Sequence, residues 1–361
     1  MSDGVVYVLG AGFTRALVPQ APLLVDDHGI LQLKSNFDAF PHAKTILDDT
    51  LAEFSDNRVD LERLMTRLSG MPYDTVDARR EFALVESALR KTLVKRLTEA
   101  AMNKDVEKVK LNKFARMVRE QKASIVTFNY DDVLDRALYL DAQYGIQPPA
   151  QHAWHPDGGY GFYCRPSTVC VTDAPTQMDD TNSLVLKLHG SINWRSRLGE
   201  GASLGPAAIL HHEDWTVKKI QFHQPDYNRI ESHLEPDPFI VPPVLVKAEL
   251  ATHPVLSVVW ALAFERLKAA KTVVFIGYSL PETDLAARTL FRESLQRRQG
   301  LNVQIVNYAQ CDKDKEKIRR TYLNLFRHLT DANFYFGGAT AWIDCQPVDE
   351  PTASSETKGS A

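Results

Sequence analysis

Five short apolar runs, rich in β-branched residues, recur along the chain with helical stretches between them. The runs are Val5–Leu9, Ser124–Phe128, Ser183–Leu188, Thr272–Gly277 and Val303–Val306. Because they are apolar on both faces, they are typical of central strands in a parallel sheet that helices cover on both sides. Most are followed by a polar turn and an amphipathic segment, so the sequence predicts an α/β fold.

A helix-rich segment at 38–122 separates the first two predicted strands and reads as a helical insertion. Two apolar stripes at i, i+3/i+4 spacing indicate its helices. They are Leu61, Leu64, Met65 and Leu68, and then Phe82, Val85, Leu89, Leu93 and Leu97. The insertion forms either a helical layer beside the sheet or a lid over a cleft, and the sequence leaves both open.

Two further ranges, 141–183 and 195–250, are irregular and rich in Pro, Gly and aromatic residues. Such loop insertions at strand ends are where α/β proteins build their sites. The tail at 346–361 lacks apolar periodicity and is predicted to be disordered. We therefore expect a single domain over 1–345.

Composition argues against several classes of protein. Lys plus Arg is 42 and Asp plus Glu is 46, a net charge of −4 that argues against direct nucleic-acid binding. No run approaches the roughly 18 apolar residues of a membrane span, and the N-terminus lacks a signal peptide, so a cytoplasmic protein is expected.

The four cysteines (Cys164, Cys170, Cys311 and Cys345) form no C-x-x-C pair. We therefore expect no four-thiolate zinc site and no metal.

A glycine turn, Gly10-Ala11-Gly12-Phe13-Thr14, follows the first predicted strand. Glycines let a backbone approach a phosphate, and the next helix N-terminus offers N–H donors. Arg15 stands where a dinucleotide fingerprint has its third glycine, which weakens an ordinary dehydrogenase interpretation. The turn either binds phosphate or is a tight strand–helix connection without a ligand.

Polar residues also follow the second and third predicted strands. Asn129 and Asp131 would lie at the carboxyl edge of the sheet, where ligands collect, or would simply cap a helix. His189, followed by a glycine, has the chemistry of a general base, but it could equally be a buried core histidine.

The last two predicted strands end in a similar way. Gly277 and Ser279 allow close approach to a ribose or phosphate, or form a plain strand–turn–helix junction in which Pro281 and the acids open a helix. Asn307 would hydrogen-bond a ribose hydroxyl or complete a turn.

Taken in order, these motifs resemble the sirtuin fold, and more specifically the sirtuin-like NAD⁺ hydrolases of bacterial anti-phage defence. The matching segments are Gly-Ala-Gly-Phe-Thr, Phe-Asn-Tyr-Asp, Leu-His-Gly, Gly-Tyr-Ser-Leu-Pro-x-Thr-Asp and Val-Asn. Ile240-Val241-Pro242-Pro243 with Lys247, and then Trp260, strengthen the match. The resemblance spans about residues 4–310 and implies a Rossmann-like parallel sheet of the sirtuin type.

The resemblance also implies a role for each candidate residue. Asn129 matches the asparagine that positions the nicotinamide ribose and the attacking water, and His189 matches the catalytic histidine. The residues that would bind NAD⁺ are Gly10, Ala11, Gly12, Phe13 and Thr14 at the pyrophosphate and adjoining ribose, Asp131 near the carboxamide, Gly277 and Ser279 at the adenosine phosphate or ribose, and Asn307 at the adenine-side ribose.

The implied function is hydrolysis of NAD⁺, as the substrate, in a regulated effector of anti-phage defence. The family also implies homo-oligomers, sometimes joined to a DNA-translocating ATPase or a short Argonaute. This chain lacks the four-cysteine zinc module of the protein deacylases, which places an acyl-peptide groove in doubt. The alternatives are a module that binds NAD⁺ or ADP-ribose without turnover, and a zinc-free deacylase or ADP-ribosyltransferase.

Overall fold

A computed structural model of the chain describes most of its predicted core. The described residues are 4–23, 37–52, 61–69, 73–144, 154, 156–162, 183–197, 207–209, 234–241, 253–281, 284–296, 298 and 300–347. Most of the two predicted loop insertions, and the tail from 348, lie outside them. So do Cys164, Cys170, Pro242, Pro243 and Lys247.

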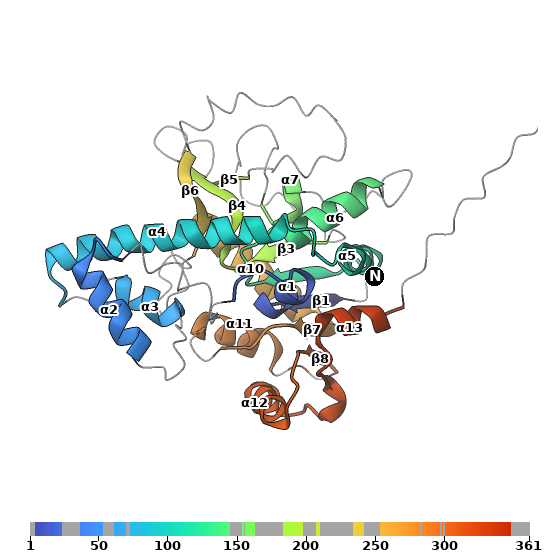
Figure 1. The fold of residues 1–361 in the computed structure, drawn as a ribbon. Helices are drawn as coiled ribbons and strands as arrows, with labels where there is room; N and C mark the ends of the chain where they lie inside the picture. Colours follow the sequence, from blue (N-terminus) through green and yellow to red (C-terminus); the bar gives the residue numbers. More distant parts are fainter. Residues whose placement is uncertain are drawn as a thin grey trace, which may run out of the picture.

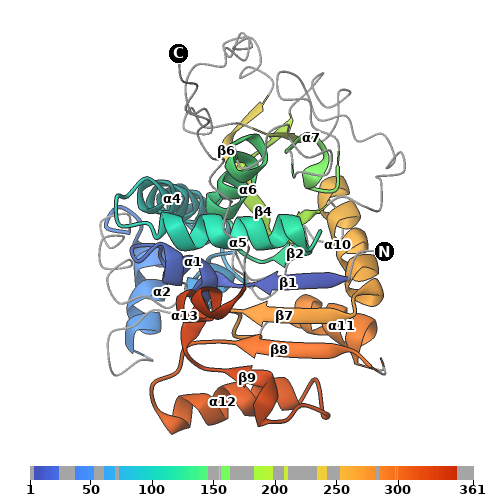
Figure 2. The same cartoon turned by 90° about the vertical axis from the view of Figure 1, so that its right-hand side faces the viewer.

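The centre of the molecule is a six-stranded sheet in the order β3-β2-β1-β7-β8-β9, and each neighbouring pair is parallel (Figures 1 and 2). The strands are β1 (Val5–Leu9), β2 (Ser124–Thr127), β3 (Val185–Lys187), β7 (Thr272–Ile276), β8 (Asn302–Val306) and β9 (Phe334–Tyr335). All five predicted strands are present, so the α/β prediction is confirmed. The sixth, β9, has two residues and was not predicted, because so short a run has no readable period.

The order of the strands reverses between β1 and β7. The chain runs outward from β1 through β2 to β3 and then returns to the other side of β1 with β7, β8 and β9. In open parallel sheets, ligands bind in the crevice at such a reversal, outside the carboxyl ends of the strands. The topology therefore directs attention to the segments that follow β1 and β7.

Helices cover both faces of this sheet. Tyr7 packs against Phe114 of α5 and Trp342 of α13, whereas Phe275 packs against Phe291 of α11 and Tyr322 of α12. In the pairing of β1 with β7, Tyr7 lies beside Val274, the residue before Phe275. Because side chains alternate between the two faces along a strand, Tyr7 and Phe275 point to opposite faces of the sheet. The two groups of helices that they contact therefore lie on opposite faces. The helices around the sheet are α1 (Ala11–Leu17), α5 (Lys108–Glu120), α6 (Val133–Tyr144), α7 (Pro156–Gly159), α10 (Pro254–Ala269), α11 (Leu285–Leu295), α12 (Asp312–Leu323), the 3-10 helix η4 (Asp331–Asn333) and α13 (Gly338–Cys345).

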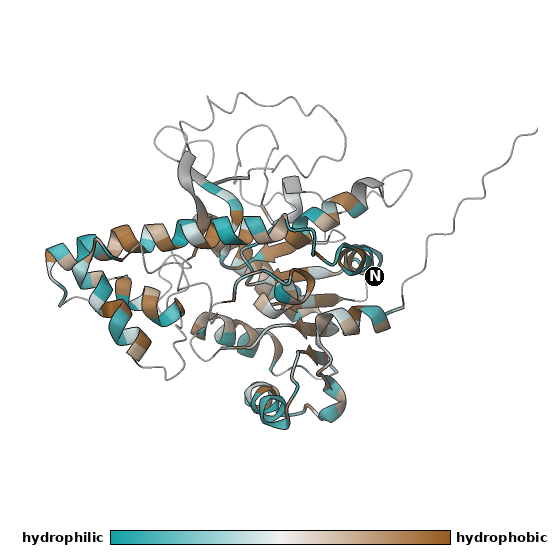
Figure 3. Cartoon of the chain, viewed as in Figure 1, coloured by the Kyte–Doolittle hydropathy of each residue, from teal (hydrophilic) through white to brown (hydrophobic). Residues whose placement is uncertain are grey.

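The predicted helical insertion contains α2 (Pro41–Ala52), α3 (Leu61–Leu68), α4 (Val76–Ala101) and α5. The first two helices and the start of α4 extend away from the sheet in Figure 1 and share a hydrophobic core separate from that of the sheet. Both predicted apolar stripes are largely buried, and Figure 3 shows brown residues interleaved with hydrophilic ones along these helices. The last turns of α4 join a third cluster, in which Leu97 lies with Tyr130, Ile192 and Ile240.

A small antiparallel sheet, in the order β5-β4-β6, begins with the strand that follows β3 in the chain. Its strands are β4 (Gly190–Arg197), β5 (Ala207–Ile209) and β6 (Leu234–Ile240). The sequence indicated loops over 195–250, and β6 was missed because its two prolines argue against a strand. Within the part of the chain that the structure describes, no helix is long and apolar enough to cross a membrane.

Candidate functional site

The glycine turn between β1 and α1 packs directly against the end of β7. A Cβ at Gly10 would lie 2.7 Å from the Gly277 carbonyl oxygen, and one at Gly12 would lie 2.8 Å from the same atom. The Gly12 amide donates to that carbonyl at 2.9 Å. Gly277 has φ +61°, and its own Cβ would lie 2.1 Å from the Phe13 amide nitrogen. A side chain at any of these three positions would clash with the backbone at the strand reversal, so the close packing alone requires glycine there, with or without a ligand.

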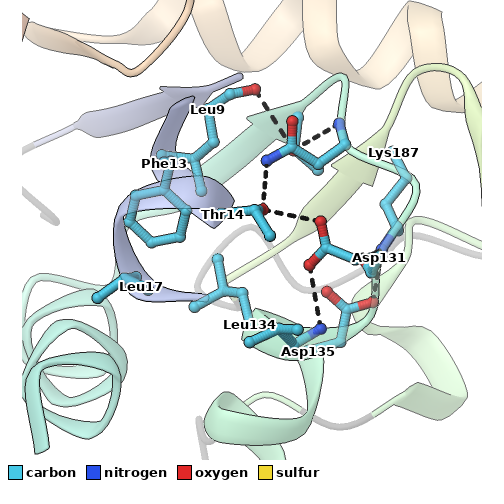
Figure 4. A pocket seen from close by; sticks show the side chains of 11 residues that line it. Leu9, Phe13, Thr14, Leu17, Asp131, Leu134, Asp135 and Lys187 are labelled. Atoms are coloured by element: carbon cyan, nitrogen blue, oxygen red, sulfur yellow. Dashed lines mark hydrogen bonds and ion pairs between the residues drawn. The ribbon is translucent and has the colours of Figure 1, made fainter. Parts of the chain in front are cut away.

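A chain of hydrogen bonds links this turn to the end of β2 (Figure 4). Asn129 Nδ2 donates to the Gly10 carbonyl and to Thr14 Oγ1, both at 2.9 Å. The Thr14 hydroxyl donates in turn to Asp131 Oδ2 at 2.7 Å. Because both hydrogens of the Asn129 amide are used, its Oδ1 is the atom suited to accept a hydrogen bond from a ligand hydroxyl or a water.

Asp131 also caps α6, because its Oδ1 accepts from the Val133 amide at 3.2 Å. The helix-start contact that the sequence offered as one alternative is therefore present, and a ligand-binding role for Asp131 stays a prediction. Burial raises the pKa of Asp131, and the positive charge of Lys187 and the hydrogen bond from Thr14 oppose that rise.

A buried ion pair, which the sequence did not assign to the site, lies behind Asp131 (Figure 4). Lys187 Nζ donates to Asp135 Oδ2 at 3.0 Å and also to the Asp131 backbone carbonyl. The two charged side chains are only 1% and 2% exposed. Tyr160 donates its hydroxyl to the same Asp135 oxygen at 2.7 Å. Burial raises the pKa of Asp135, and Lys187 opposes this. A lysine inside an otherwise apolar predicted strand was the available signal.

His189 follows β3 and is almost fully buried, with 7% of its surface exposed. Its Nε2 lies 3.5 Å from Asp284 Oδ2. Its ring packs edge-on against Phe128, with 5.2 Å between ring centroids, and lies 6.3 Å from the Tyr130 ring. Asp284 also caps α11, because its Oδ1 accepts from the Ala287 amide at 3.2 Å. The sequence indicated the helix-opening role of Asp284 but not its contact with the histidine.

The backbone around His189 is held by two segments that the sequence also singled out. The Val241 amide donates to the His189 carbonyl at 2.8 Å, and the Tyr130 hydroxyl donates to the Val241 carbonyl at 2.8 Å. Trp260 Nε1 donates to the Leu188 carbonyl at 2.8 Å. The position of the histidine is therefore fixed from β6 and α10 as well as from β3.

The remaining candidates follow β7 and β8. Asn307 is buried, and its Nδ2 donates to the Tyr278 carbonyl at 3.2 Å, so the end of β8 is tied to the end of β7. Ser279 is exposed. The Tyr278 ring stacks on Phe128 with 4.5 Å between centroids. Burial raises the pKa of the Tyr278 phenol well above its ordinary value, so this ring is neutral.

The structure therefore joins the candidates into two groups. One contains the glycine turn, Asn129 and Asp131, linked by hydrogen bonds. The other contains His189 with its aromatic and carboxylate neighbours. The segment 128–130 belongs to both, since Phe128 and Tyr130 contact the imidazole while Asn129 between them contacts the turn. Among the described residues, no group of three or more His, Cys, Asp or Glu side chains is placed to hold a metal ion.

Comparison with known proteins gives one family and several distant structures. Residues 123–327 match the family described as SIR2-like domain. No curated protein matches the chain. Among solved structures, one reported for the mechanism and regulation of Sir2 enzymes is 13% identical, with a TM-score of 0.40 over 94% of this chain and 88% of that one. A Sir2 homologue–NAD complex is 14% identical, with a TM-score of 0.39 over 89% and 90% of the two chains. A mutant Sir2 homologue with ADP-ribose is 14% identical, with a TM-score of 0.38 over 90% and 94%.

Proposed function

This chain belongs to the SIR2-like domain family, and on that premise we propose that it binds NAD⁺ and hydrolyses the bond between nicotinamide and ribose. The products would be nicotinamide and ADP-ribose. The substrate would lie along the carboxyl edge of the six-stranded sheet, at the strand reversal.

The observation that carries this proposal is the order of the candidate residues along that edge. Following the strands from β3 to β8, the edge presents His189, then Asn129, then the glycine turn, then Gly277 with Ser279, and finally Asn307. A dinucleotide has its parts in a matching order: nicotinamide ribose, pyrophosphate, adenosine ribose. The order of these residues along the edge therefore supports binding of a single extended ligand.

The chemistry asks little of the protein beyond positioning and one proton acceptor. The leaving nicotinamide is already cationic before the bond breaks, and the sugar carbon becomes oxocarbenium-like. The enzyme has to orient the sugar, admit one water and remove its proton. Asn129 Oδ1 would orient a ribose hydroxyl or the water, because the amide group is fixed by Gly10 and Thr14. His189 would accept the proton.

The test is to incubate purified protein with NAD⁺ and to separate the products by chromatography, with and without an acylated peptide. Release of nicotinamide and ADP-ribose without peptide is the expected result. Turnover only with peptide would favour a zinc-free deacylase, and transfer of ADP-ribose to protein would favour a transferase. Tight binding of NAD⁺ without turnover, both over a wide range of protein concentrations and after addition of the partner proteins proposed below, would indicate a binding module and refute the hydrolase.

Unregulated hydrolysis of NAD⁺ would harm the cell that makes the enzyme. We therefore propose that the chain is a regulated effector, of the kind used in anti-phage defence, that is kept inactive until it assembles. Assembly would involve copies of this chain or a partner such as a DNA-translocating ATPase or a short Argonaute. Light scattering, run beside the activity assay, tests this: a monomer with full activity at every concentration would contradict it.

A further inference from the structure

The hydrogen bonds that link Gly10, Asn129, Thr14 and Asp131 run in one direction. The Gly10 carbonyl can only accept, so the group of Asn129 that lies 2.9 Å from it is the NH₂ group. That NH₂ group also donates to Thr14 Oγ1 at 2.9 Å, so the Thr14 hydroxyl gives its own hydrogen to Asp131 Oδ2 at 2.7 Å. The chain of donors therefore ends on Asp131, which has to accept.

Asp131 suits this position as a carboxylate. Its Oδ2 accepts from Thr14 and its Oδ1 accepts from the Val133 amide at 3.2 Å, so a proton on either oxygen would compete with a hydrogen that is already directed at it. A protonated Oδ2 would also compete with Asn129 for Thr14 Oγ1, and the amide would lose its fixed orientation. The ionisation of Asp131 therefore decides how firmly Asn129 Oδ1 is presented to a ligand.

Lys187 places a positive charge beside this buried carboxylate. From β3, its Nζ donates to the Asp131 backbone carbonyl and to Asp135 Oδ2, the latter at 3.0 Å (Figure 4). A buried carboxylate is costly unless a cation compensates it. We propose that Lys187 is a positioning residue for Asn129: its ammonium group keeps Asp131 as the carboxylate on which the hydrogen bonds end. This inference rests on the proposed NAD⁺ hydrolysis, in which Asn129 orients the ribose or the water.

Other charged groups act on the Asp131 carboxyl from α6. Burial raises the pKa of Asp131, the charge of Lys187 opposes this, and the charges of Asp135 and Asp132 add to the rise. Tyr160 of α7 donates to Asp135 at 2.7 Å, and burial raises the pKa of this phenol well above its ordinary value, so it stays neutral. Removing Lys187 and removing Asp135 should therefore change the ionisation of Asp131 in opposite directions.

The test compares proteins that differ in the charge of the lysine. Lys187→Met alone would leave Asp135 buried without its cation, so the substitution is made together with Asp135→Asn, whose amide oxygen still accepts the Tyr160 hydroxyl. Lys187→Gln in the same background is a second neutral variant, which retains a donor for the Asp131 carbonyl. If one of the two fails to fold, the other decides the question. Lys44→Met in that background neutralises a half-exposed lysine on α2 and is the matched control.

Two NMR signals are followed against pH. They are the side-chain carboxyl carbon of Asp131, assigned with Asp131→Asn, and the side-chain NH₂ group of Asn129, assigned with Asn129→Ala. In Asp135→Asn the carboxyl should titrate at a lower pH than in the wild type. In both neutral lysine variants it should titrate at a higher pH than in Asp135→Asn, with about tenfold less ionised Asp131 at acidic pH. The Asn129 signal should change at the same pH as the carboxyl in each protein, and the control should match Asp135→Asn.

Activity should follow the same titration. In the neutral lysine variants, kcat for nicotinamide release should be about tenfold below that of Asp135→Asn at acidic pH. It should return toward that value as the pH rises and the carboxylate is restored. A purely structural role of Lys187 would instead lower kcat by the same factor at every pH.

Three results would overturn the proposal: a loss of kcat that is independent of pH, an Asp131 carboxyl that titrates at the same pH with and without the lysine charge, or an Asn129 signal that does not follow it. If the wild-type protein releases no nicotinamide, the proposed function fails. The two NMR titrations alone then decide whether Lys187 acts on Asn129 through Asp131.

Discussion

Replacing Lys187 by methionine tests the buried charges behind Asp131. Methionine has a similar length but no charge, so Asp135 would be left 2% exposed with no cation beside it. Removing one partner of a buried ion pair costs about 3–5 kcal/mol. Against a total stability of roughly 5–15 kcal/mol for a typical domain, this is a large fraction. The midpoint of thermal unfolding should fall by roughly 5–10 °C.

The cost depends on the lone carboxylate, so a second substitution should recover much of it. In Lys187→Met with Asp135→Asn, the charge is gone, and the amide oxygen still accepts the Tyr160 hydroxyl that now bonds Asp135. Urea unfolding of the wild type, both single variants and the double variant gives the coupling energy directly. A single-variant cost below about 1 kcal/mol, or a double variant no more stable than Lys187→Met, would refute the reasoning.

The same variant should show an altered pH dependence. Burial raises the pKa of Asp135, and Lys187 opposes that rise, so removing the lysine raises this pKa further. The folded variant then keeps a proton that the unfolded chain gives up at the ordinary pKa of aspartate. The loss in free energy of unfolding, relative to the wild type, is therefore greatest at pH values above the raised pKa of Asp135. It shrinks as the pH falls toward the ordinary pKa of aspartate. If the charge were not responsible, unfolding curves at several pH values would show the same loss at each pH.

Three further predictions follow from the site. Thr14→Val leaves both the Asn129 amide and the Asp131 carboxylate short of a partner and should cost about 2–4 kcal/mol in urea unfolding, whereas Thr14→Ser keeps the hydroxyl and should cost less than half of that. Gly277→Ala should destabilise by at least about 1–3 kcal/mol, because φ is +61° and the new Cβ would meet the Phe13 amide nitrogen; an unchanged unfolding midpoint would contradict this. Asn129→Ala and His189→Ala should each abolish nicotinamide release while circular dichroism shows a folded protein, and wild-type turnover in both would contradict the mechanism.

The strands of the large sheet could be predicted because each is an uninterrupted apolar run. Val5–Leu9 has the same limits in sequence and structure, and the other four predicted strands differ by one or two residues at their ends. The residues placed after them could be predicted for the same reason, since parallel strands present their carboxyl ends at one edge. The local sequence could not predict which of these candidate site residues form hydrogen bonds with one another.

Contacts between distant segments account for the residues that were missed. Asp284 has the usual pattern of a helix cap, and nothing nearby in the sequence indicates a histidine at 3.5 Å. Lys187 belongs to an apolar strand, and its partner Asp135 lies on α6, so only the packing of the two elements brings the charges together. The same holds for β6, where two prolines argue against a strand that pairing with β4 nevertheless forms.

The described helices of the insertion differ in what they pack against. The helix α5 lies beside the sheet as a layer, because its Phe114 packs on Tyr7 of β1. In contrast, α2 and α3 bury their apolar faces in a separate hydrophobic core. Among the described residues, Leu97 of α4 packs with Tyr130, and Glu62 of α3 and Arg90 of α4 act electrostatically on the same tyrosine. Tyr130 lies between Asn129 and Asp131 in the chain and beside the His189 ring. The insertion therefore supports the site at the segment that joins its two groups of residues.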